Sequence, residues 1–519
     1  MRRRLVPLLV CLVVGACGGL PTGAADDSSV RIALEAPSEL DPARAGDAQS
    51  SAVIAQLFET LTTFDEALEL KPALAASWRI EDDARRVVFT LRPDLRFSDD
   101  SPLRPSDVVR SWLRVIDPAS PSPLATLVED VRGAAAYADG EGTAEDVGLI
   151  ADDGRNEVIV ELDRAAADFP AIAASPTLAV VPPGIDGAAA LSAGEDFVAS
   201  GGYRLVDERA TEMILQANPR YWAGTPAIGR ITVVTGLGGA SPVEEFESGD
   251  LDYVGIGSED AAWIAYDATL GPRLLTVPAI STDYYGFDTS TPPFDDVRVR
   301  RAFGAAVDWR RIARLAVDDP NAVATSMVPP GIPDRSARDM LPEHDPEAAR
   351  ALLAEAGFPD GRGFPRVTLM TGGSPYDEAV VEEVERTLGI RLAQETMDFG
   401  AYFDRLETDP PAIWFVSWIA DYPGRNDFLG VLLGSGTANN YGRWRSADFD
   451  AAIADAGAST DPAVASAAFD RAEEIVKRDV PVVPVTYGTG WALAREGLLG
   501  TGQNGLGSMR FAGLAWSTP

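Results

Sequence analysis

Short strand-like segments alternate with amphipathic helical segments along most of this 519-residue chain. Among the segments with a strand pattern are residues 30–34, 87–91, 157–162 and 212–218. Residues 50–61 place five apolar side chains on one helical face, and Asp345 before Pro346 predicts a second helix that ends at Gly357. No internal repeat or low-complexity block interrupts the alternation, so the sequence predicts an α/β fold.

The length predicts more than one lobe, because 519 residues exceed what a single hydrophobic core usually holds. Hydrophobic residues make up 46% of the chain and charged residues 24%, which is typical of a folded globular protein. The 79 acidic residues outnumber the 44 basic ones, and the net charge is −35. A surface this acidic favours cationic or neutral partners, so we expect no nucleic-acid partner.

The amino terminus has the pattern of an export signal. Arginines at positions 2–4 precede a 12-residue apolar run at 5–16, which is too short to span a bilayer. The run ends in Val-Gly-Ala-Cys, which resembles the site at which bacterial lipoproteins are cleaved and lipidated. We therefore expect residues 1–16 to be a signal peptide and Cys17 to be the lipidated first residue. An ordinary secretory signal with an incidental cysteine is the alternative.

Residues 17–29 are small and polar without periodicity, which predicts a flexible tether. No later window contains 18 uninterrupted apolar residues. We therefore expect an extracytoplasmic body that is attached to the cell membrane through the lipid anchor only.

Residue types for catalysis are scarce in this chain. It has one histidine, His344, and two cysteines, which are too few for most zinc or haem sites and for a Cys/His nucleophile pair. Adjacent aspartates such as Asp82 and Asp83 are frequent by chance among 79 acids, so surface groups explain them better than general acids and bases. Nucleophile-elbow, zincin, P-loop and EF-hand motifs are missing from the sequence. We expect no catalytic residues, no metal and no cofactor.

Several longer phrases, spread from about residue 30 to the end, together indicate a family. They include LFETLTTFD at 57–65, LKPALAASW at 70–78, FTLRPDLRFSDDSPLRPSDVVRSWLRVIDP at 89–118, NPRYWAG at 218–224, PPFDDVRVRRAFGAAVDWRRI at 292–312, DPEAARALLAEAGFPDGRGFP at 345–365 and WIADYP at 418–423. By their number and order, the chain resembles the bacterial extracellular solute-binding proteins of family 5. These are the receptors of oligopeptide, dipeptide and nickel ABC importers.

The resemblance implies a two-lobed clamshell of the periplasmic-binding-protein type, in the large class (type II) with an extra inserted subdomain. Its expected parts are lobe I at 30–50, 185–269 and 486–519, the inserted subdomain at 51–184, and lobe II at 270–485. It also implies a monomer that captures a peptide or another small solute and delivers it to the permease subunits of an ABC importer. An envelope lipoprotein of the same fold, with a structural, regulatory or glycolipid-handling role, is the alternative.

The phrase WIADYP is the candidate ligand site. In peptide-binding relatives its aspartate, here Asp421, holds the α-ammonium group of the ligand; the alternative is that Asp421 only caps a turn. Trp418 and Tyr422 flank the carboxylate as an apolar wall. One face of the strand that contains Tyr284 and Tyr285 is also expected to line the pocket. Residues 414–416 lack the arginine with which some oligopeptide binders hold the ligand's carboxylate, so ligand length and peptide identity stay open.

The helix entry near residue 297 carries a cluster of opposite charges. Arg300 and Arg301 are expected to pair with Asp295 or Asp296. We interpret this cluster as a structural ion-pair network and not as a ligand contact.

Overall fold

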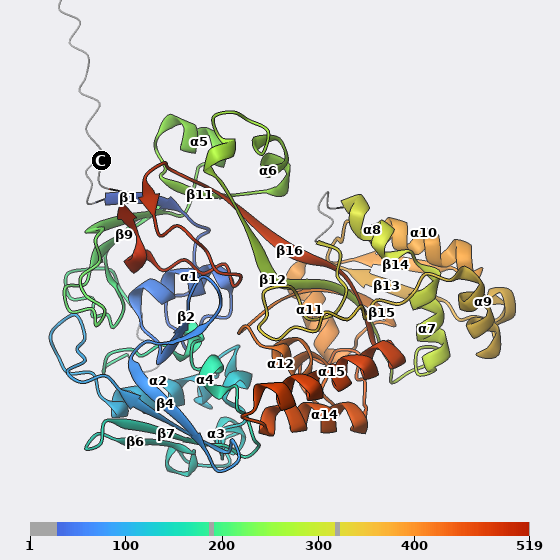
Figure 1. Cartoon of the computed structure of the whole chain (residues 1–519), viewed down its shortest axis with the longest axis horizontal. Coiled ribbons are helices and arrows are strands. Elements are labelled where there is room, and N and C mark those ends of the chain that lie inside the picture. The colour runs from blue at the N-terminus through green and yellow to red at the C-terminus, as the bar shows by residue number, and fades with distance from the viewer. Residues whose placement is uncertain (1–28, 186–190, 317–321, 518–519) are drawn as a thin grey trace, which may run out of the picture.

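The computed structural model describes residues 29–185, 191–316 and 322–517. Figure 1 shows two lobes joined by two long strands, β12 (Leu274–Phe287) and β16 (Val482–Ala494). We call the half that contains residues 29–270 the first lobe and the half that contains residues 290–480 the second lobe. The expected signal peptide, Cys17 and the tether as far as residue 28 lie outside the described residues.

One mixed sheet of ten strands runs through both lobes. Its order is β14 (Leu392–Thr396), β13 (Val367–Thr371), β15 (Ile413–Ile419), β12, β16, β11 (Tyr253–Ile256), β1 (Ser29–Ala33), β10 (Arg230–Val234), β9 (Glu212–Ala217) and β8 (Tyr203–Glu208). β1 pairs in parallel with β10 and β11, and β13 pairs in parallel with β14 and β15. Parallel pairs need crossover connections, and helices provide them, which confirms the α/β prediction.

The antiparallel ladder between β12 and β16 crosses from one lobe to the other. Its register shifts between Pro278 and Thr282, so residues 279–281 leave the ladder. There Ile280 donates its N–H to the carbonyl of Gly505 and accepts a hydrogen bond from the N–H of Ala420. The interruption lies where the two lobes meet, and such breaks bend and twist a strand pair locally.

A separate four-stranded sheet forms the lower part of the first lobe in Figure 1. Its order is β4 (Ala75–Glu81), β5 (Arg86–Leu91), β7 (Glu157–Glu161) and β6 (Leu149–Asp152), and its helices are α2 (Pro105–Leu113), α3 (Ala134–Ala138) and α4 (Phe169–Ile172). Phe89, Trp112 and Phe169 are fully buried between them, with ring centroids 6.0–6.5 Å apart. We call this unit the subdomain. The predicted domain boundaries stay a prediction.

Further elements cover the ten-stranded sheet and link it to the subdomain. In the first lobe they are α1 (Ala48–Leu57), α5 (Pro242–Ser248), α6 (Ser258–Ile264), the pair β2 (Thr62–Phe64) with β3 (Leu70–Pro72), and the pair β17 (Leu498–Leu499) with β18 (Ala515–Trp516). In the second lobe they are α7 (Val297–Ala306), α8 (Trp309–Ala316), α9 (Pro346–Glu355), α10 (Asp377–Leu388), α11 (Phe399–Thr408), α12 (Arg425–Phe428), α13 (Gly430–Leu433), α14 (Ala447–Ala458) and α15 (Pro462–Asp479).

Several local predictions are confirmed. The four segments predicted as strands form β1, β5, β7 and β9. The Asp345 carboxylate accepts hydrogen bonds from the N–H groups of Glu347 and Ala348, which caps α9 as its sequence predicts, and Gly357 follows the helix with φ 101°.

Two local predictions are wrong in part. The helix predicted over 50–61 ends at Leu57, and Leu61 packs in the subdomain core instead. Arg300 and Arg301 do not pair with carboxylates. Arg300 donates to the backbone carbonyls of Phe294, Asp295 and Asp479, and Arg301 donates to the carbonyl of Arg478. The carbonyls of Phe294 and Asp295 lie at the end of the loop before α7, and those of Arg478 and Asp479 lie at the end of α15. Both arginines therefore donate to backbone carbonyls that accept no hydrogen bond within a helix.

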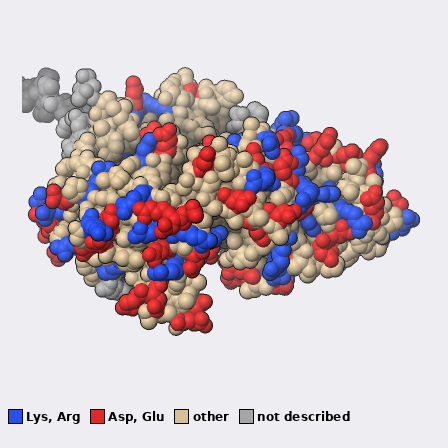
Figure 2. All heavy atoms as spheres, turned by 60° about the horizontal axis from the view of Figure 1, so that its bottom comes forward, with Lys and Arg blue, Asp and Glu red and all other residues tan. Residues whose placement is uncertain are grey.

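Within the part of the chain that the structure describes, no helix combines the length and apolar character needed to cross a bilayer. Figure 2 shows acidic and basic side chains closely interspersed on the face that carries the subdomain and the second lobe, without a large basic area. That face therefore gives no sign of an electrostatic patch for an anionic surface.

Candidate functional site

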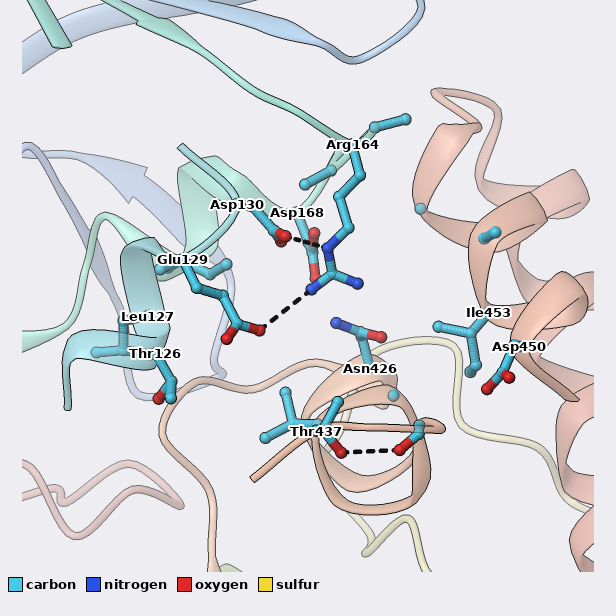
Figure 3. A pocket seen from close by; sticks show the side chains of 18 of the residues that line it. Thr126, Leu127, Glu129, Asp130, Arg164, Asp168, Asn426, Thr437, Asp450 and Ile453 are labelled. Atoms are coloured by element: carbon cyan, nitrogen blue, oxygen red, sulfur yellow. Dashed lines mark hydrogen bonds and ion pairs between the residues drawn. The ribbon is translucent and has the colours of Figure 1, made fainter. Parts of the chain in front are cut away.

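A cavity of about 630 Å³ lies between the subdomain and the second lobe. Its lining from the subdomain comes from Arg85, from residues 126–130 before α3 and from the segment 164–172. Its lining from the second lobe comes from 421–439 and α14. Figure 3 shows these two sets of side chains facing one another across an open space. Ligand pockets commonly have this size and often lie between domains.

Asp421 lies on the second-lobe side of the cavity, two residues after β15 ends at Ile419. Ala420 is held by its hydrogen bond to Ile280, and the chain then turns toward α12, which directs Asp421 to the cavity. Its carboxylate accepts no hydrogen bond and forms no ion pair with any described residue. Burial raises the pKa of this carboxyl from 3.8 to about 6. The turn-cap interpretation of Asp421 therefore has no contact to support it.

Asp427 is a second carboxylate beside Asp421, and it is 0% exposed. Its Oδ2 accepts a hydrogen bond from Trp418 Nε1 at 2.9 Å, while its Oδ1 has no hydrogen-bond partner among the described residues. Burial and the charge of Asp421 raise the pKa of Asp427 well above its usual range. The two acids therefore repel each other, and together they favour a positive group nearby.

Tyr422 joins the two lobes. Its ring is buried in the subdomain core, and its hydroxyl donates to Asp168 Oδ2 at 2.8 Å and accepts from Asn426 Nδ2 at 3.0 Å. Beside this contact, Ala167 donates its N–H to the carbonyl of Gly457 on α14 at 2.9 Å. A Cβ at Gly457 would lie 3.0 Å from the carbonyl oxygen of Ala165, so the backbones approach closely. The structure is thus a conformation in which the lobes are in contact.

On the subdomain side, three carboxylates surround one guanidinium group. Arg164 pairs with Asp130 and lies 3.8 Å from Glu129, and its charge also acts on Asp168. Burial raises the pKa of Asp168, and burial together with Asp130 raises the pKa of Glu129. Figure 3 shows Arg164 reaching toward the centre of the cavity between these acids. Negative charge is therefore in excess on this side as well.

Comparison with known proteins identifies the class of receptor. Residues 69–440 match the family described as bacterial extracellular solute-binding proteins, family 5 Middle. The chain is a family 5 solute-binding protein. The probable deoxycholate-binding periplasmic protein YgiS of Escherichia coli K12 is 29% identical over 471 residues, which cover 87% of this chain and 86% of that protein. The periplasmic murein peptide-binding protein MppA of the same strain is 26% identical over 488 residues, or 91% and 89% of the two chains.

Solved structures of the family agree with the fold. The unliganded open form of the periplasmic murein tripeptide-binding protein MppA superposes with a TM-score of 0.79 at 23% identity, over 95% of this chain and 98% of that chain. The two-lobed clamshell prediction is thereby confirmed. Family membership also confirms that this extracytoplasmic protein binds a solute and is not an enzyme.

The cavity of this family 5 protein includes two of the predicted ligand-binding residues, Asp421 and Tyr422. Trp418 is partly buried behind them and reaches Asp427 instead of the cavity. Tyr284 and Tyr285 are each 1% exposed and do not line this cavity. Tyr284 packs on Trp414 with ring centroids 5.5 Å apart, and the Tyr285 hydroxyl donates to Asp377 at 2.7 Å. The structure therefore gives these two tyrosines core contacts.

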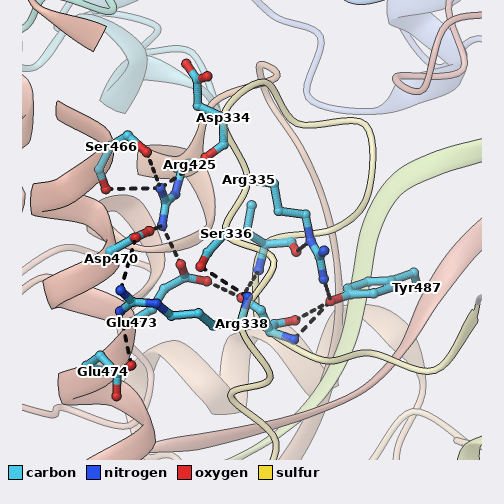
Figure 4. Close-up of polar contacts among 12 residues, drawn as sticks. Asp334, Arg335, Ser336, Arg338, Arg425, Ser466, Asp470, Glu473, Glu474 and Tyr487 are labelled. Carbon is cyan, nitrogen blue, oxygen red and sulfur yellow. Dashed lines mark hydrogen bonds and ion pairs between the residues drawn. The ribbon is translucent and has the colours of Figure 1, made fainter. Parts of the chain in front are cut away.

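Arg425 anchors the segment that carries Asp421 (Figure 4). Its side chain is 2% exposed and pairs with Asp470 at 2.8 Å and with Glu473, both on α15. It also donates to the backbone carbonyls of Asp334 and Ser466. A buried pair is costly to break once one partner is removed. Arg425 thus fixes α12, and through it the turn at 421–424, against α15.

Sequence reasoning did not find Asp168, Arg164, Asn426 or Gly457. Asn426 lies five residues after Asp421, so its proximity to the site was the one available signal. The other three reach the site only through the contact between the lobes.

Proposed function

We infer that this protein binds peptides with a free amino terminus in the cavity between its lobes, and that Asp421 receives the α-ammonium group. The observation that carries the proposal is the Asp421 carboxylate, which lines the cavity with its pKa raised by burial and with no partner among the described residues. A carboxylate in that state gains most from a cationic ligand, because pairing offsets the cost of its burial.

The named relatives support a peptide and also name a rival. One of them is a murein peptide-binding protein, while the other is named for deoxycholate. Deoxycholate is an anion, and the described cavity lining holds six carboxylates against two arginines. The charge of the lining favours the peptide.

In this proposal the protein delivers its ligand to an ABC importer and is held at the membrane by a lipid on Cys17. Support for the anchor comes from the Val-Gly-Ala-Cys sequence at 14–17. Closure of the lobes around a ligand gives the permease a surface that differs from that of the open form. An envelope lipoprotein without a transport ligand is the alternative, and a protein that binds no peptide would favour it.

Native mass spectrometry of the purified protein first tests for a co-purified ligand. The protein is then stripped of ligand, and calorimetry measures alanine-based peptides of two to five residues, each with a free and an N-acetylated amino terminus. Deoxycholate is the rival probe. We expect free peptides to bind, and acetylated peptides and deoxycholate to bind at least tenfold more weakly.

The variant Asp421→Asn tests the contact from the protein side. Removing one partner of a buried ion pair costs about 3 to 5 kcal/mol, so free peptide should lose about a hundredfold or more in affinity. The variant should then distinguish little between free and acetylated peptides. Asp409→Asn is the control, because Asp409 is exposed, pairs with Arg405 and does not line the cavity. Additive losses from acetylation and mutation would overturn the assignment of Asp421.

A further inference from the structure

The cavity holds more negative charge than one α-ammonium group can balance. Of its six lining carboxylates, three have a cation within 4 Å: Glu129 and Asp130 share Arg164, and Asp455 pairs with Arg471 at 2.7 Å. The other three are Asp168, Asp421 and Asp450, and none of them forms an ion pair with a described residue. A ligand with a single positive charge at Asp421 leaves two of these carboxylates without a cation.

The arginines in the lining do not change this balance. The Arg164 guanidinium is surrounded by Glu129, Asp130 and Asp168. Arg85 donates to the backbone carbonyl of Asp163 and is exposed to solvent. Asp427 adds a further carboxyl group directly behind Asp421, 0% exposed and with its Oδ1 unpartnered, and a nearby cation would favour its charged form. The field in the cavity is therefore negative on both sides, and it opposes a carboxylate within it.

Asp168 and Asp450 differ as sites for a second cation. Asp168 accepts the hydrogen bond of Tyr422 across the lobes, and the nearby positive charge of Arg164 would repel another cation. Asp450 lies on α14, and its carboxylate accepts one hydrogen bond from the backbone N–H of Ser435 at 3.0 Å. Figure 3 shows Asp450 on the α14 side of the cavity, away from Arg164. Asp450 is therefore the better placed of the two.

We propose that the cavity selects ligands with a second positive charge in addition to the α-ammonium group, and that Asp450 is the carboxylate that receives it. The ligand class is then a peptide with a basic side chain, whose terminal carboxylate lies outside the negative field. This inference rests on the proposed peptide-binding function and adds a specificity-determining residue to it. It also agrees with the missing arginine at 414–416, since no group for a ligand carboxylate is then needed there.

Matched peptides test the proposal by calorimetry on stripped protein. Each of three alanine tripeptides carries lysine at the first, second or third position, and its counterpart carries norleucine, which has the same chain without the ammonium group. We expect at least one lysine peptide to bind about tenfold or more tightly than its norleucine counterpart. Equal affinity in all three pairs, or tighter binding of a glutamate peptide, would overturn the proposal.

Asp450→Asn then tests the residue. Asparagine keeps the shape and can still accept the Ser435 hydrogen bond, so the fold should be retained. We expect the lysine preference to fall to within about twofold. Asp409→Asn should keep the full preference. A lysine preference that persists in Asp450→Asn would overturn the assignment of Asp450.

The diamine 1,5-diaminopentane separates this proposal from the proposed function. If no peptide binds but the diamine does, selection of cations stands and peptide binding is wrong. If peptides bind without regard to charge, peptide binding stands and the selection of cations is wrong. If neither peptide nor diamine binds, both proposals are wrong.

Discussion

The Asp421→Asn variant should make the ligand-free protein more stable at neutral pH. In the folded protein the pKa of Asp421 is raised from 3.8 to about 6 by burial, so the folded state holds this proton more tightly than the unfolded state. The free energy of unfolding therefore falls as the pH rises from about 4 through about 6, and it stays lower above that pH. Asparagine carries no charge and does not incur this loss.

The size of the effect follows from the shift. At about 1.4 kcal/mol for each pH unit, raising the pKa from 3.8 to about 6 corresponds to about 3 kcal/mol above pH 7. Asp421 and Asp427 form a pair of neighbouring acids. Asp168 also acts on Asp427 through its charge. Removing the Asp421 charge also removes one cause of the raised pKa of Asp427. This change should increase the free energy of unfolding at neutral pH as well. If the 519 residues unfold together, this free energy corresponds to a rise in melting temperature of about 3 °C.

Thermal unfolding of stripped wild type and Asp421→Asn at pH 4 and pH 7.5 checks the prediction. The variant should melt higher at pH 7.5, and the difference should shrink at pH 4, where the wild-type carboxyl is protonated. Asp409→Asn, which alters an exposed pair with Arg405, should change stability by less than about 0.5 kcal/mol at both pH values. A variant that melts lower at pH 7.5 would show that Asp421 has a stabilising partner, and would refute its interpretation as an unpaired ligand group.

Four further predictions follow from the sequence and the lobe contact. Cys17→Ser should move the protein from the membrane fraction to the soluble fraction, and normal processing with membrane retention would contradict the anchor. A bound peptide at about 100 times its Kd should stabilise the protein by about 2.7 kcal/mol, seen as a higher melting temperature. Tyr422→Phe removes the hydrogen bond to Asp168, so calorimetry should show about a tenfold loss of peptide affinity. Gly457→Ala places a methyl group 3.0 Å from the Ala165 carbonyl, so small-angle scattering with saturating peptide should show a less closed molecule than wild type.

Local signals in the sequence predicted local structure well. Asp345 with Pro346 fixes the start of α9 through side-chain hydrogen bonds that need no distant partner. Asp421 was found because its phrase is shared by a family. The end of α1 at Leu57 was missed, because Leu61 has the right helical spacing but is buried in the subdomain core. The spacing of apolar residues does not tell which core will bury them.

The contact between the lobes could not be predicted from the sequence. Tyr422 and Asp168 are 254 residues apart, and neither carries a signal for the other. The two tyrosines of β12 illustrate a second limit. Tyr284 and Tyr285 point to opposite faces of a central strand, and the structure buries both faces. A two-residue period predicts a pocket-lining face only where one face of the sheet is open.

The break in the ladder between β12 and β16 has a mechanical consequence. Paired strands resist stretching and sliding, so the interruption of the pairing at residues 279–281 favours rotation of one lobe against the other. The hydrogen bond from Tyr422 to Asp168 joins the lobes without any ligand side chain, so a closed form that keeps it need not depend on the side chains of the ligand. In the proposed transport function, a permease in contact with both lobes would respond to the angle between them and not to the ligand. Such a receptor can bind ligands with different side chains and still adopt the same closed conformation.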